Sequence, residues 1–165
     1  MVLNNLDIKK ADTKTDIKKA DIKKLDIKKP DIKLVAIDLD DTMLCSDCRI
    51  SERNRRALQK AQEQGVTITI ATGRMFVSAQ PFALELGISV PLITYQGAMI
   101  VMADGRVISH HPMDHKISCS LLRFLRPFGY HINLYMGDDL YIEKDSPEAR
   151  RYQSYTRTYL NIVPD

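Results

Sequence analysis

The chain has 165 residues, 44% of them hydrophobic, which suits one ordinary globular domain. Its formal net charge is +3, but residues 1–33 hold ten lysines and six aspartates, so the basic character belongs to this end of the chain. The N-terminus lacks the apolar core of a secretory signal, and no apolar stretch is long enough to span a bilayer. Three cysteines, an odd number, favour a reduced, cytoplasmic protein.

An Asp-Ile-Lys-Lys pattern recurs with a period of five over residues 6–35. A period of five matches neither a helix nor a strand, so the isoleucines cannot form one apolar stripe. We expect residues 1–31 to be a low-complexity, mostly disordered extension. The functional alternative is an arm that binds nucleic acid or a membrane, but the interleaved aspartates offset much of the lysine charge and argue against both partners.

The first predicted strand, Leu34–Ile37, reads as buried on both faces, as in a parallel sheet. It runs directly into Asp38, Asp40 and Asp41, at the strand end where open α/β sheets bind their ligands. Because Asp38 and Asp40 are two positions apart, extended backbone points their side chains the same way. Such carboxylates repel each other unless a cation lies between them, and Mg²⁺ suits oxygen ligands. The plain alternative is an acidic turn that ends a strand.

A Cys-x-x-Cys pair, Cys45 and Cys48, lies in the loop that follows, over residues 42–50. A redox or zinc role would require a helix N-terminus or a second cysteine pair, and neither is evident. We therefore favour two thiols in a loop.

A helix capped by Ser51 and ended by Gly65 leads into a second strand over residues 66–71. Strand, helix and strand predict a right-handed βαβ unit, whose two strands end at the same edge of the sheet. Thr72, Gly73 and Arg74 follow the second strand and supply a hydroxyl, a glycine and a cation, a pattern typical of a phosphate-binding turn. Either motif is weak alone, but the two together are specific.

The rest of the chain predicts a further series of helices and strands. They are a helix over 76–86, a strand over 92–94, a hairpin of 99–102 and 107–109, a helix from Asp114 or Ser118 to about 128, a hairpin of 130–135 and 140–143, a helix over 147–159, and a strand at 162–163. Asp138 and Asp139 resemble an acidic metal motif, but the strand pattern after them favours a hairpin turn. The four histidines show no convincing metal-ligand arrangement.

Three motifs together resemble the Cof-type phosphatases of the haloacid dehalogenase superfamily. They are Asp-Leu-Asp-Asp-Thr-Met-Leu over residues 38–44, Ala-Thr-Gly-Arg over 71–74 and Ile-Thr-Tyr-Gln-Gly-Ala over 93–98. The resemblance covers about residues 32–165. It implies an α/β fold with a Rossmann-like parallel sheet core, of which 32–110 would be the first half, and the beginning of an α/β cap domain over 111–165.

The resemblance also implies Mg²⁺-dependent hydrolysis of small phosphorylated metabolites such as sugar phosphates. Asp38 would be the nucleophile that forms an aspartyl-phosphate, and Asp40 the general acid and base. Mg²⁺ would be held by the Asp38 carboxylate and the Asp40 backbone carbonyl. Phosphate oxygens would be bound by backbone N–H groups around Leu39 and Asp41, by the Thr72 hydroxyl and by the Gly73 N–H.

Some expected features of this family differ or are absent. Asp41 stands where many relatives have Gly, and Gln96 where Asn is usual. The lysine and the late acidic motif that complete such a site have no counterpart in the right context, although Lys116 and Lys144 are present. We therefore expect an N-terminal portion of such an enzyme, inactive by itself if these groups are indispensable. The alternatives are a non-catalytic remnant that binds phosphate, a basic-tailed nucleic-acid binder and a phosphate-accepting receiver domain.

Overall fold

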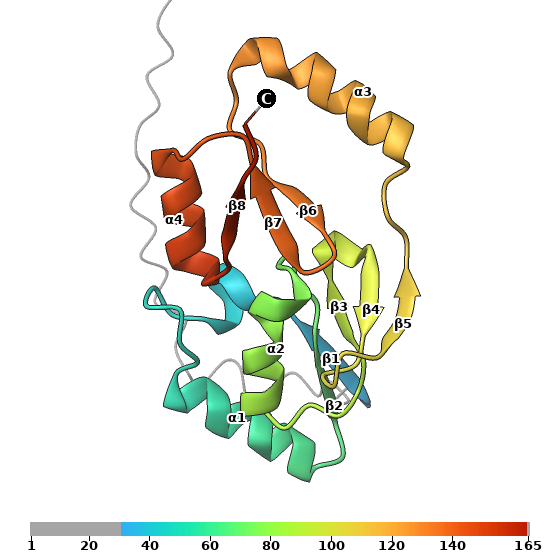
Figure 1. The fold of residues 1–165 in the computed structure, drawn as a ribbon. Coiled ribbons are helices and arrows are strands. Elements are labelled where there is room, and N and C mark those ends of the chain that lie inside the picture. The colour runs from blue at the N-terminus through green and yellow to red at the C-terminus, as the bar shows by residue number, and fades with distance from the viewer. Residues whose placement is uncertain (1–30, 165) are drawn as a thin grey trace, which may run out of the picture. The chain divides into compact units, whose positions relative to one another are not determined.

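The computed structural model describes residues 31–164 (Figure 1). Residues 32–164 belong to one compact unit. The predicted disordered extension and most of its repeat lie outside the described residues. The described part is an α/β fold, as expected, and its strands form three small sheets. None of its helices has the length and apolar character needed to cross a membrane.

The first sheet is the predicted βαβ unit. Strand β1 (Leu34–Ile37) pairs in parallel with β2 (Thr67–Ile70), and α1 (Glu52–Glu63) joins them. The Ser51 hydroxyl accepts a hydrogen bond of 3.1 Å from the Asn54 N–H and so caps α1, as predicted. Gly65, with a φ of 82°, ends the connection in the left-handed region. Both strands therefore deliver the residues that follow them to the same edge of the sheet.

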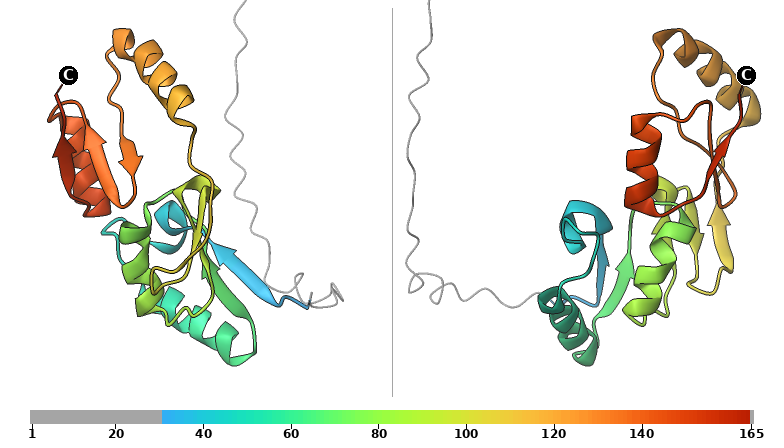
Figure 2. Two further views of the ribbon diagram at one scale, coloured as in Figure 1. Left: turned by 45° about the vertical axis from the view of Figure 1, so that its right-hand side comes forward. Right: turned by 60° about the vertical axis from the view of Figure 1, so that its left-hand side comes forward.

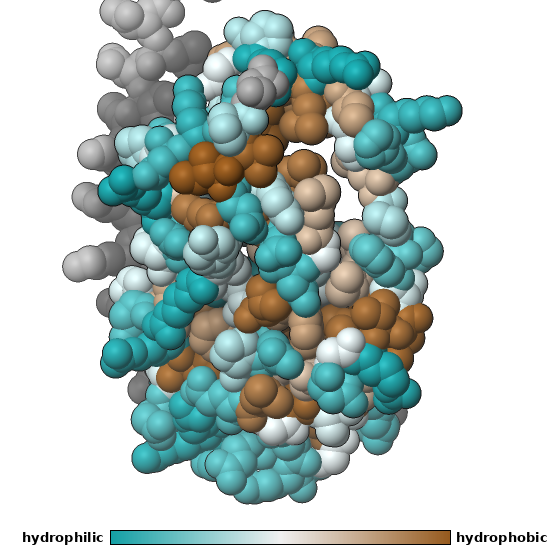
Figure 3. All heavy atoms as spheres, viewed as in Figure 1, coloured by the Kyte–Doolittle hydropathy of each residue, from teal (hydrophilic) through white to brown (hydrophobic). Residues whose placement is uncertain are grey.

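The second sheet is antiparallel and continues from the first. It contains β3 (Leu92–Thr94), β4 (Met99–Val101) and β5 (Val107–His110) in that order, after α2 (Phe76–Glu85). Ala71 bridges Ile93 in parallel, which ties the end of β2 to β3. The predicted helix, strand and hairpin of this region are confirmed. In Figure 3 an apolar patch lies over β5, where Val107 and Ile108 are 51% and 52% exposed.

The prediction that β1 is buried on both faces is wrong. Val35 and Ile37 pack against the main hydrophobic cluster, whereas Leu34 is 56% exposed and Ala36 is also exposed. The described residues place β2 on one side of β1 and no strand on the other. An apolar run predicts two covered faces only when the rest of a sheet and its helices are present to cover them.

The third sheet is built from the C-terminal part of the chain. Strands β6 (Leu134–Met136) and β7 (Asp139–Ile142) form an antiparallel hairpin, and β8 (Leu160–Ile162) pairs with β7 in parallel. The connection between β7 and β8 is α4 (Pro147–Thr156), which lies beside these strands in Figure 2. Leu140 and Ala149 are fully buried, which shows that α4 packs on the sheet.

Helix α3 (His115–Leu125) precedes this sheet. Of the two predicted starting points the structure selects Asp114, whose carboxylate accepts hydrogen bonds from two backbone N–H groups, of Lys116 and Ile117. Two other boundaries were predicted wrongly. Residues 130–133 are not a strand, because β7 is short and pairs only with Leu134–Met136. Helix α4 ends at Thr156 rather than 159, because Arg157 adopts a left-handed conformation with a φ of 57°.

Candidate active site

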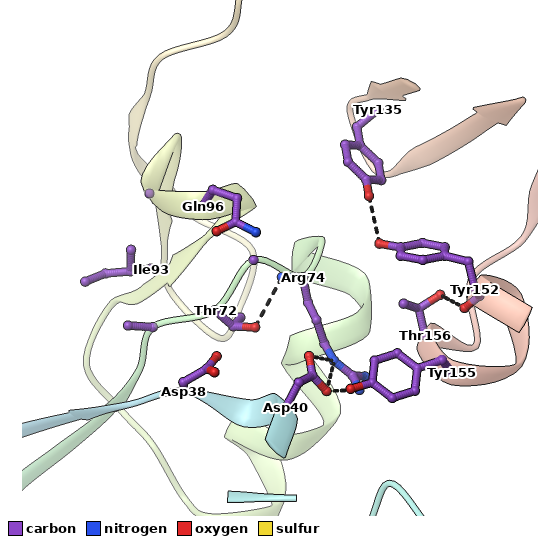
Figure 4. A pocket seen from close by; sticks show the side chains of 13 residues that line it. Asp38, Asp40, Thr72, Arg74, Ile93, Gln96, Tyr135, Tyr152, Tyr155 and Thr156 are labelled. Atoms are coloured by element: carbon purple, nitrogen blue, oxygen red, sulfur yellow. Dashed lines mark hydrogen bonds and ion pairs between the residues drawn. The ribbon is translucent and has the colours of Figure 1, made fainter. Parts of the chain in front are cut away.

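A cavity of about 610 Å³ lies at the carboxyl ends of β1 and β2 (Figure 4). One wall carries four of the predicted site residues, namely Asp38, Asp40, Thr72 and Gly73. The opposite wall comes from the third sheet and α4 and carries Tyr135, Tyr152, Tyr155 and Thr156. The cavity is thus enclosed by residues more than a hundred positions apart in the sequence.

A tight turn after β1 separates the two carboxylates. Asp38 is still extended, with φ and ψ of −74° and 151°, and its side chain is exposed to the cavity. Residues Leu39–Met43 then form the turn, which the Leu44 N–H closes by donating to the Leu39 carbonyl at 2.8 Å. Asp41 takes a φ of 54°, the left-handed conformation that glycine adopts most easily. This conformation explains why glycine suits this position.

The remaining two predicted site residues do not line the cavity with their side chains. The Leu39 side chain is fully buried in the hydrophobic cluster and anchors the turn. Asp41 is exposed and faces a different hollow, between this turn and α4. Their predicted role in phosphate binding involves only their backbone N–H groups and stays a prediction.

Asp40 is held by Arg74 in a two-pronged ion pair. The Arg74 Nε donates to both carboxylate oxygens at 2.9 and 3.1 Å, and Nη2 donates to Oδ1 at 2.6 Å. The Arg74 side chain is only 4% exposed and that of Asp40 is 27% exposed. A buried guanidinium needs such a partner, because an unpaired charge away from water is strongly disfavoured.

Tyr155 adds a third contact to this pair. Its hydroxyl donates a hydrogen bond to the Asp40 carboxylate, and its ring lies under the Arg74 guanidinium at 4.8 Å (Figure 4). Partial burial raises the pKa of Asp40, but hydrogen bonds from Arg74 and Tyr155 and the charge of Arg74 outweigh this effect, so the pKa lies below its usual value. Burial and the contact with Asp40 raise the pKa of Tyr155 to about 12, so its hydroxyl stays protonated at neutral pH.

The second motif forms a turn directly after β2. The Thr72 side chain is buried, and its hydroxyl oxygen accepts a hydrogen bond of 3.2 Å from the Arg74 N–H. Its own hydroxyl hydrogen can therefore be donated into the cavity. Gly73 lies directly beneath the Gln96 amide, since a Cβ on Gly73 would stand 2.0 Å from Gln96 Nε2. Gly73 thus leaves room for a carboxamide at the wall of the cavity.

Two tyrosines of the opposite wall, Tyr135 and Tyr152, contact each other, and Tyr135 also contacts Tyr95. The hydroxyls of Tyr135 and Tyr152 are hydrogen bonded at 2.8 Å, and the rings of Tyr95 and Tyr135 meet edge to face at 5.9 Å. The Tyr95 hydroxyl donates to the Gly137 carbonyl at 2.9 Å. Burial is the main cause that raises the pKa values of Tyr95 and Tyr152 above the usual range.

No group of three or more acids, histidines or cysteines gathers into a metal site among the described residues. Asp138 and Asp139 lie in and after the β6–β7 turn, where Asp138 accepts a hydrogen bond of 3.2 Å from Tyr95. The donors available to a metal at the cavity are the Asp38 carboxylate and the carbonyl groups of the turn. These are hard oxygen ligands, which suit a Mg²⁺ ion that keeps several waters and also binds a phosphate oxygen.

Sequence reasoning left the role of Arg74 open and did not single out the tyrosines. A signal for the tyrosines was present, because Tyr152, Tyr155 and Thr156 follow a spacing of three and four that puts them on one face of a helix. Which helix face would meet the cavity depends on the packing of α4, and the sequence pattern does not contain that information.

Comparison with known proteins places the chain in a family. The sequence profile of the haloacid dehalogenase-like hydrolases matches residues 35–164. Phosphatase YwpJ of Bacillus subtilis is 32% identical over 115 residues, which cover 70% of this chain and 40% of that protein. The 5-amino-6-(5-phospho-D-ribitylamino)uracil phosphatase YwtE of the same organism is 32% identical over 106 residues, 64% of this chain and 36% of that protein.

Solved structures agree with the sequence matches. A haloacid dehalogenase-like hydrolase from B. subtilis superposes with a TM-score of 0.70 at 25% identity, over 80% of this chain and 54% of that one. One from Bacteroides thetaiotaomicron also gives a TM-score of 0.70 at 25% identity, over 81% and 52% of the two chains. The chain thus spans about half the length of these structures and less of the curated relatives.

Proposed function

Since the chain belongs to the haloacid dehalogenase-like hydrolases, with phosphatases among its relatives, we propose that it hydrolyses small phosphate monoesters at the cavity beside Asp38. The observation that carries this proposal is the meeting of two motifs. The carboxylates of Asp38 and Asp40 and the hydroxyl turn at Thr72 and Gly73 line one cavity, although 34 residues separate the Asp38 and Thr72 positions in the chain.

Asp38 is the proposed nucleophile. Its carboxylate is exposed to the cavity, whereas Asp40 is already held by Arg74 and Tyr155. An oxygen of Asp38 attacks phosphorus, the phosphorus–oxygen ester bond breaks, and the leaving alcohol takes a proton from Asp40, which must first take up that proton against the lowered pKa that Arg74 and Tyr155 give its carboxyl. Water, deprotonated by Asp40, then attacks the phosphorus of the aspartyl-phosphate and releases inorganic phosphate.

The phosphate would be positioned by groups from both motifs. The Thr72 hydroxyl and the Gly73 N–H stand on the same cavity wall as Asp38. Backbone N–H groups of the turn at residues 39–41 would add further donors, as oriented amides do at anion sites. Together they would hold the phosphoryl group in line with the attacking oxygen.

Mg²⁺ fits the donor set as a cofactor. The Asp38 carboxylate and the Asp40 backbone carbonyl would hold it, and waters and a phosphate oxygen would complete its shell. When bound, the ion would neutralise charge on the phosphoryl oxygens and reduce repulsion between phosphate and Asp38. The side chain of Asp40 would remain with Arg74.

The division of the chain is part of the proposal. Residues 32–110 would be the first half of a Rossmann-like core and 111–165 the beginning of a cap that covers the site. Tyr135, Tyr152 and Tyr155 would then face the alcohol part of the substrate. The curated relatives are phosphatases of varied substrates, and the ester that this chain prefers would be decided by those tyrosines.

A second candidate is a domain that binds phosphate without turnover. One observation favours it, because the described residues bring no third acid to Asp38. Loss of charge stabilisation at a developing transition state costs about 3 kcal/mol per group in well-studied enzymes, so a site with few cationic or metal ligands can bind phosphate yet turn over slowly.

Hydrolysis of p-nitrophenyl phosphate, with and without Mg²⁺, tests the first candidate against the second. The full chain is compared with Asp38→Asn, which keeps the shape of the side chain and removes the nucleophile. Turnover that needs Mg²⁺ and disappears in Asp38→Asn supports the phosphatase. Equal rates in both proteins, together with measurable binding of inorganic phosphate, would identify the non-catalytic binder instead.

A further inference from the structure

The last turn of α4 contacts the Asp40–Arg74 pair at two points and is connected to it at a third through Ser78 of α2. The Tyr155 hydroxyl donates to Asp40, and the Tyr155 ring lies 4.8 Å from the Arg74 guanidinium carbon. Arg74 Nη1 donates at 3.1 Å to the Ser78 hydroxyl, which in turn donates at 2.9 Å to the Thr156 carbonyl. Helix α4, which begins 107 positions after Asp40 in the chain, is thereby connected to the predicted acid and base.

These contacts restrict both partners of the pair. Phe82, 5.5 Å from the guanidinium carbon, and Tyr155 both contact Arg74, and the side chain is 4% exposed. Asp40 retains 27% exposure of its side chain. Its two oxygens accept three hydrogen bonds from Arg74 and one from Tyr155, so the direction in which the carboxyl faces the cavity is set by these donors.

A purely structural role for Tyr155 would be satisfied by its ring. The ring alone can pack against Arg74, and a hydroxyl that served only solubility would point to water. Instead the hydroxyl is directed at Asp40, as Figure 4 shows. The polar end of Tyr155 therefore contacts the predicted acid and base directly.

We propose that Tyr155 is a positioning residue, which through its hydroxyl and through Arg74 orients the Asp40 carboxyl toward the leaving oxygen of the ester. This inference rests on the proposed function, because Asp40 needs an orientation only if it transfers a proton. It assigns to α4 a part in the chemistry of the core and not only in covering the substrate. Orientation of a proton donor is a condition for its efficiency.

Two esters whose leaving groups differ in basicity distinguish a positioning role of Tyr155 from a packing role. p-Nitrophenolate leaves without help from an acid, whereas the phenolate of phenyl phosphate benefits from a proton. In Tyr155→Phe we expect kcat/KM, which covers only the steps up to departure of the leaving group, to fall about tenfold for phenyl phosphate and less than about twofold for p-nitrophenyl phosphate. Tyr159→Phe is the matched control, since Tyr159 is 75% exposed and lies outside the cavity.

Equal losses on both esters, or no loss on either, would overturn the inference. If the wild-type chain shows no turnover that depends on Asp38, the proposed catalysis fails, and a second measurement decides the positioning. In ¹⁵N-labelled protein the Arg74 Nε–H signal is assigned by its absence in Arg74→Lys. Tyr155→Phe should shift it and Tyr159→Phe should not. A signal unchanged by Tyr155→Phe would show that the hydroxyl does not act on the pair.

Discussion

Ser78 on α2 donates a hydrogen bond of 2.9 Å from its hydroxyl to the carbonyl of Thr156 at the end of α4, and Ser78 is 5% exposed. The same hydroxyl accepts a hydrogen bond of 3.1 Å from Arg74. Both residues that Ser78 contacts in this way, Arg74 and Thr156, are buried. The bond connects two helices that the sequence separates by 78 positions. Its strength therefore contributes to how firmly α4 is held over the cavity.

Replacement of Ser78 by Ala should lower the free energy of unfolding by about 1–3 kcal/mol, because a buried carbonyl and a guanidinium N–H each lose a partner. Urea unfolding of the two proteins measures the difference. Ser120→Ala is the control, since the Ser120 hydroxyl bonds only its own helix at an exposed position. A loss of similar size in both variants would mean that the Ser78–Thr156 connection has no special weight.

Removal of the Arg74 charge should be much more costly. Arg74→Met leaves the partly buried Asp40 carboxylate without its partner, and we expect a loss of about 3–5 kcal/mol in the free energy of unfolding. Arg150→Met removes the same charge from an exposed pair with Asp145 and should change stability little. The prediction fails if chemical denaturation gives similar midpoints for the two variants.

Gly73→Ala tests whether the absence of a side chain at Gly73 leaves the space that the Gln96 amide occupies. The new methyl group would stand 2.0 Å from Gln96 Nε2, and the flexible Gln96 side chain can swing away without moving the backbone. We expect a change of less than about 1 kcal/mol in the free energy of unfolding. Binding of inorganic phosphate, measured by calorimetry, should weaken at least about threefold, because the displaced Gln96 side chain then occupies part of the cavity.

The double variant Gly73→Ala with Gln96→Ala removes the clash and serves as the control. If phosphate binding recovers in the double variant, the crowding at Gln96 caused the loss. If it stays weak, the methyl group itself obstructs the Gly73 N–H. Unchanged phosphate binding in Gly73→Ala would contradict a role of this turn in the site.

The half-buried Tyr95 and Tyr152 predict a loss of stability in alkali. The pKa values of Tyr95 and Tyr152 are raised above the ordinary value of 10.0, chiefly by burial. A tyrosine whose pKa is higher in the folded than in the unfolded protein keeps its proton in the folded state at a pH at which the unfolded chain has already lost it. Their contribution to stability is therefore complete below about pH 10 and is lost as the pH rises toward the folded values.

Denaturant unfolding between pH 8 and 11 measures this effect. The free energy of unfolding should begin to fall near pH 10, and Tyr152→Phe should make the fall shallower. Tyr159→Phe, at an exposed position, should leave the slope as it is in the wild type. An identical slope in all three proteins would show that Tyr152 does not contribute.

Local signals in the sequence predicted most elements of the fold. Ser51 and Asp114 cap their helices, the turn at residues 103–106 joins a hairpin, and β1 pairs with β2 in parallel. Each of these depends on neighbouring residues or on a short crossover. The exposure of Leu34 was missed because burial of a strand depends on which strands and helices cover it.

The two walls of the cavity differed in how well the sequence predicted them. Asp38, Asp40, Thr72 and Gly73 were found because strand ends in a parallel sheet share an edge. Arg74 belonged to a recognised motif, but its pairing with Asp40 required the turn at residues 39–43, whose geometry depends on the left-handed Asp41. The tyrosines come from the third sheet and from α4, and no local pattern states which surface these elements approach.

The tyrosines also give the cavity an intrinsic fluorescence probe. The chain has seven tyrosines and no tryptophan, and three of the seven line this one hollow. Ultraviolet emission from the protein therefore comes from phenol rings alone, without the stronger indole signal that usually masks them. A ligand that enters beside Tyr135, Tyr152 and Tyr155 should change this emission directly, so occupancy can be followed with no label attached.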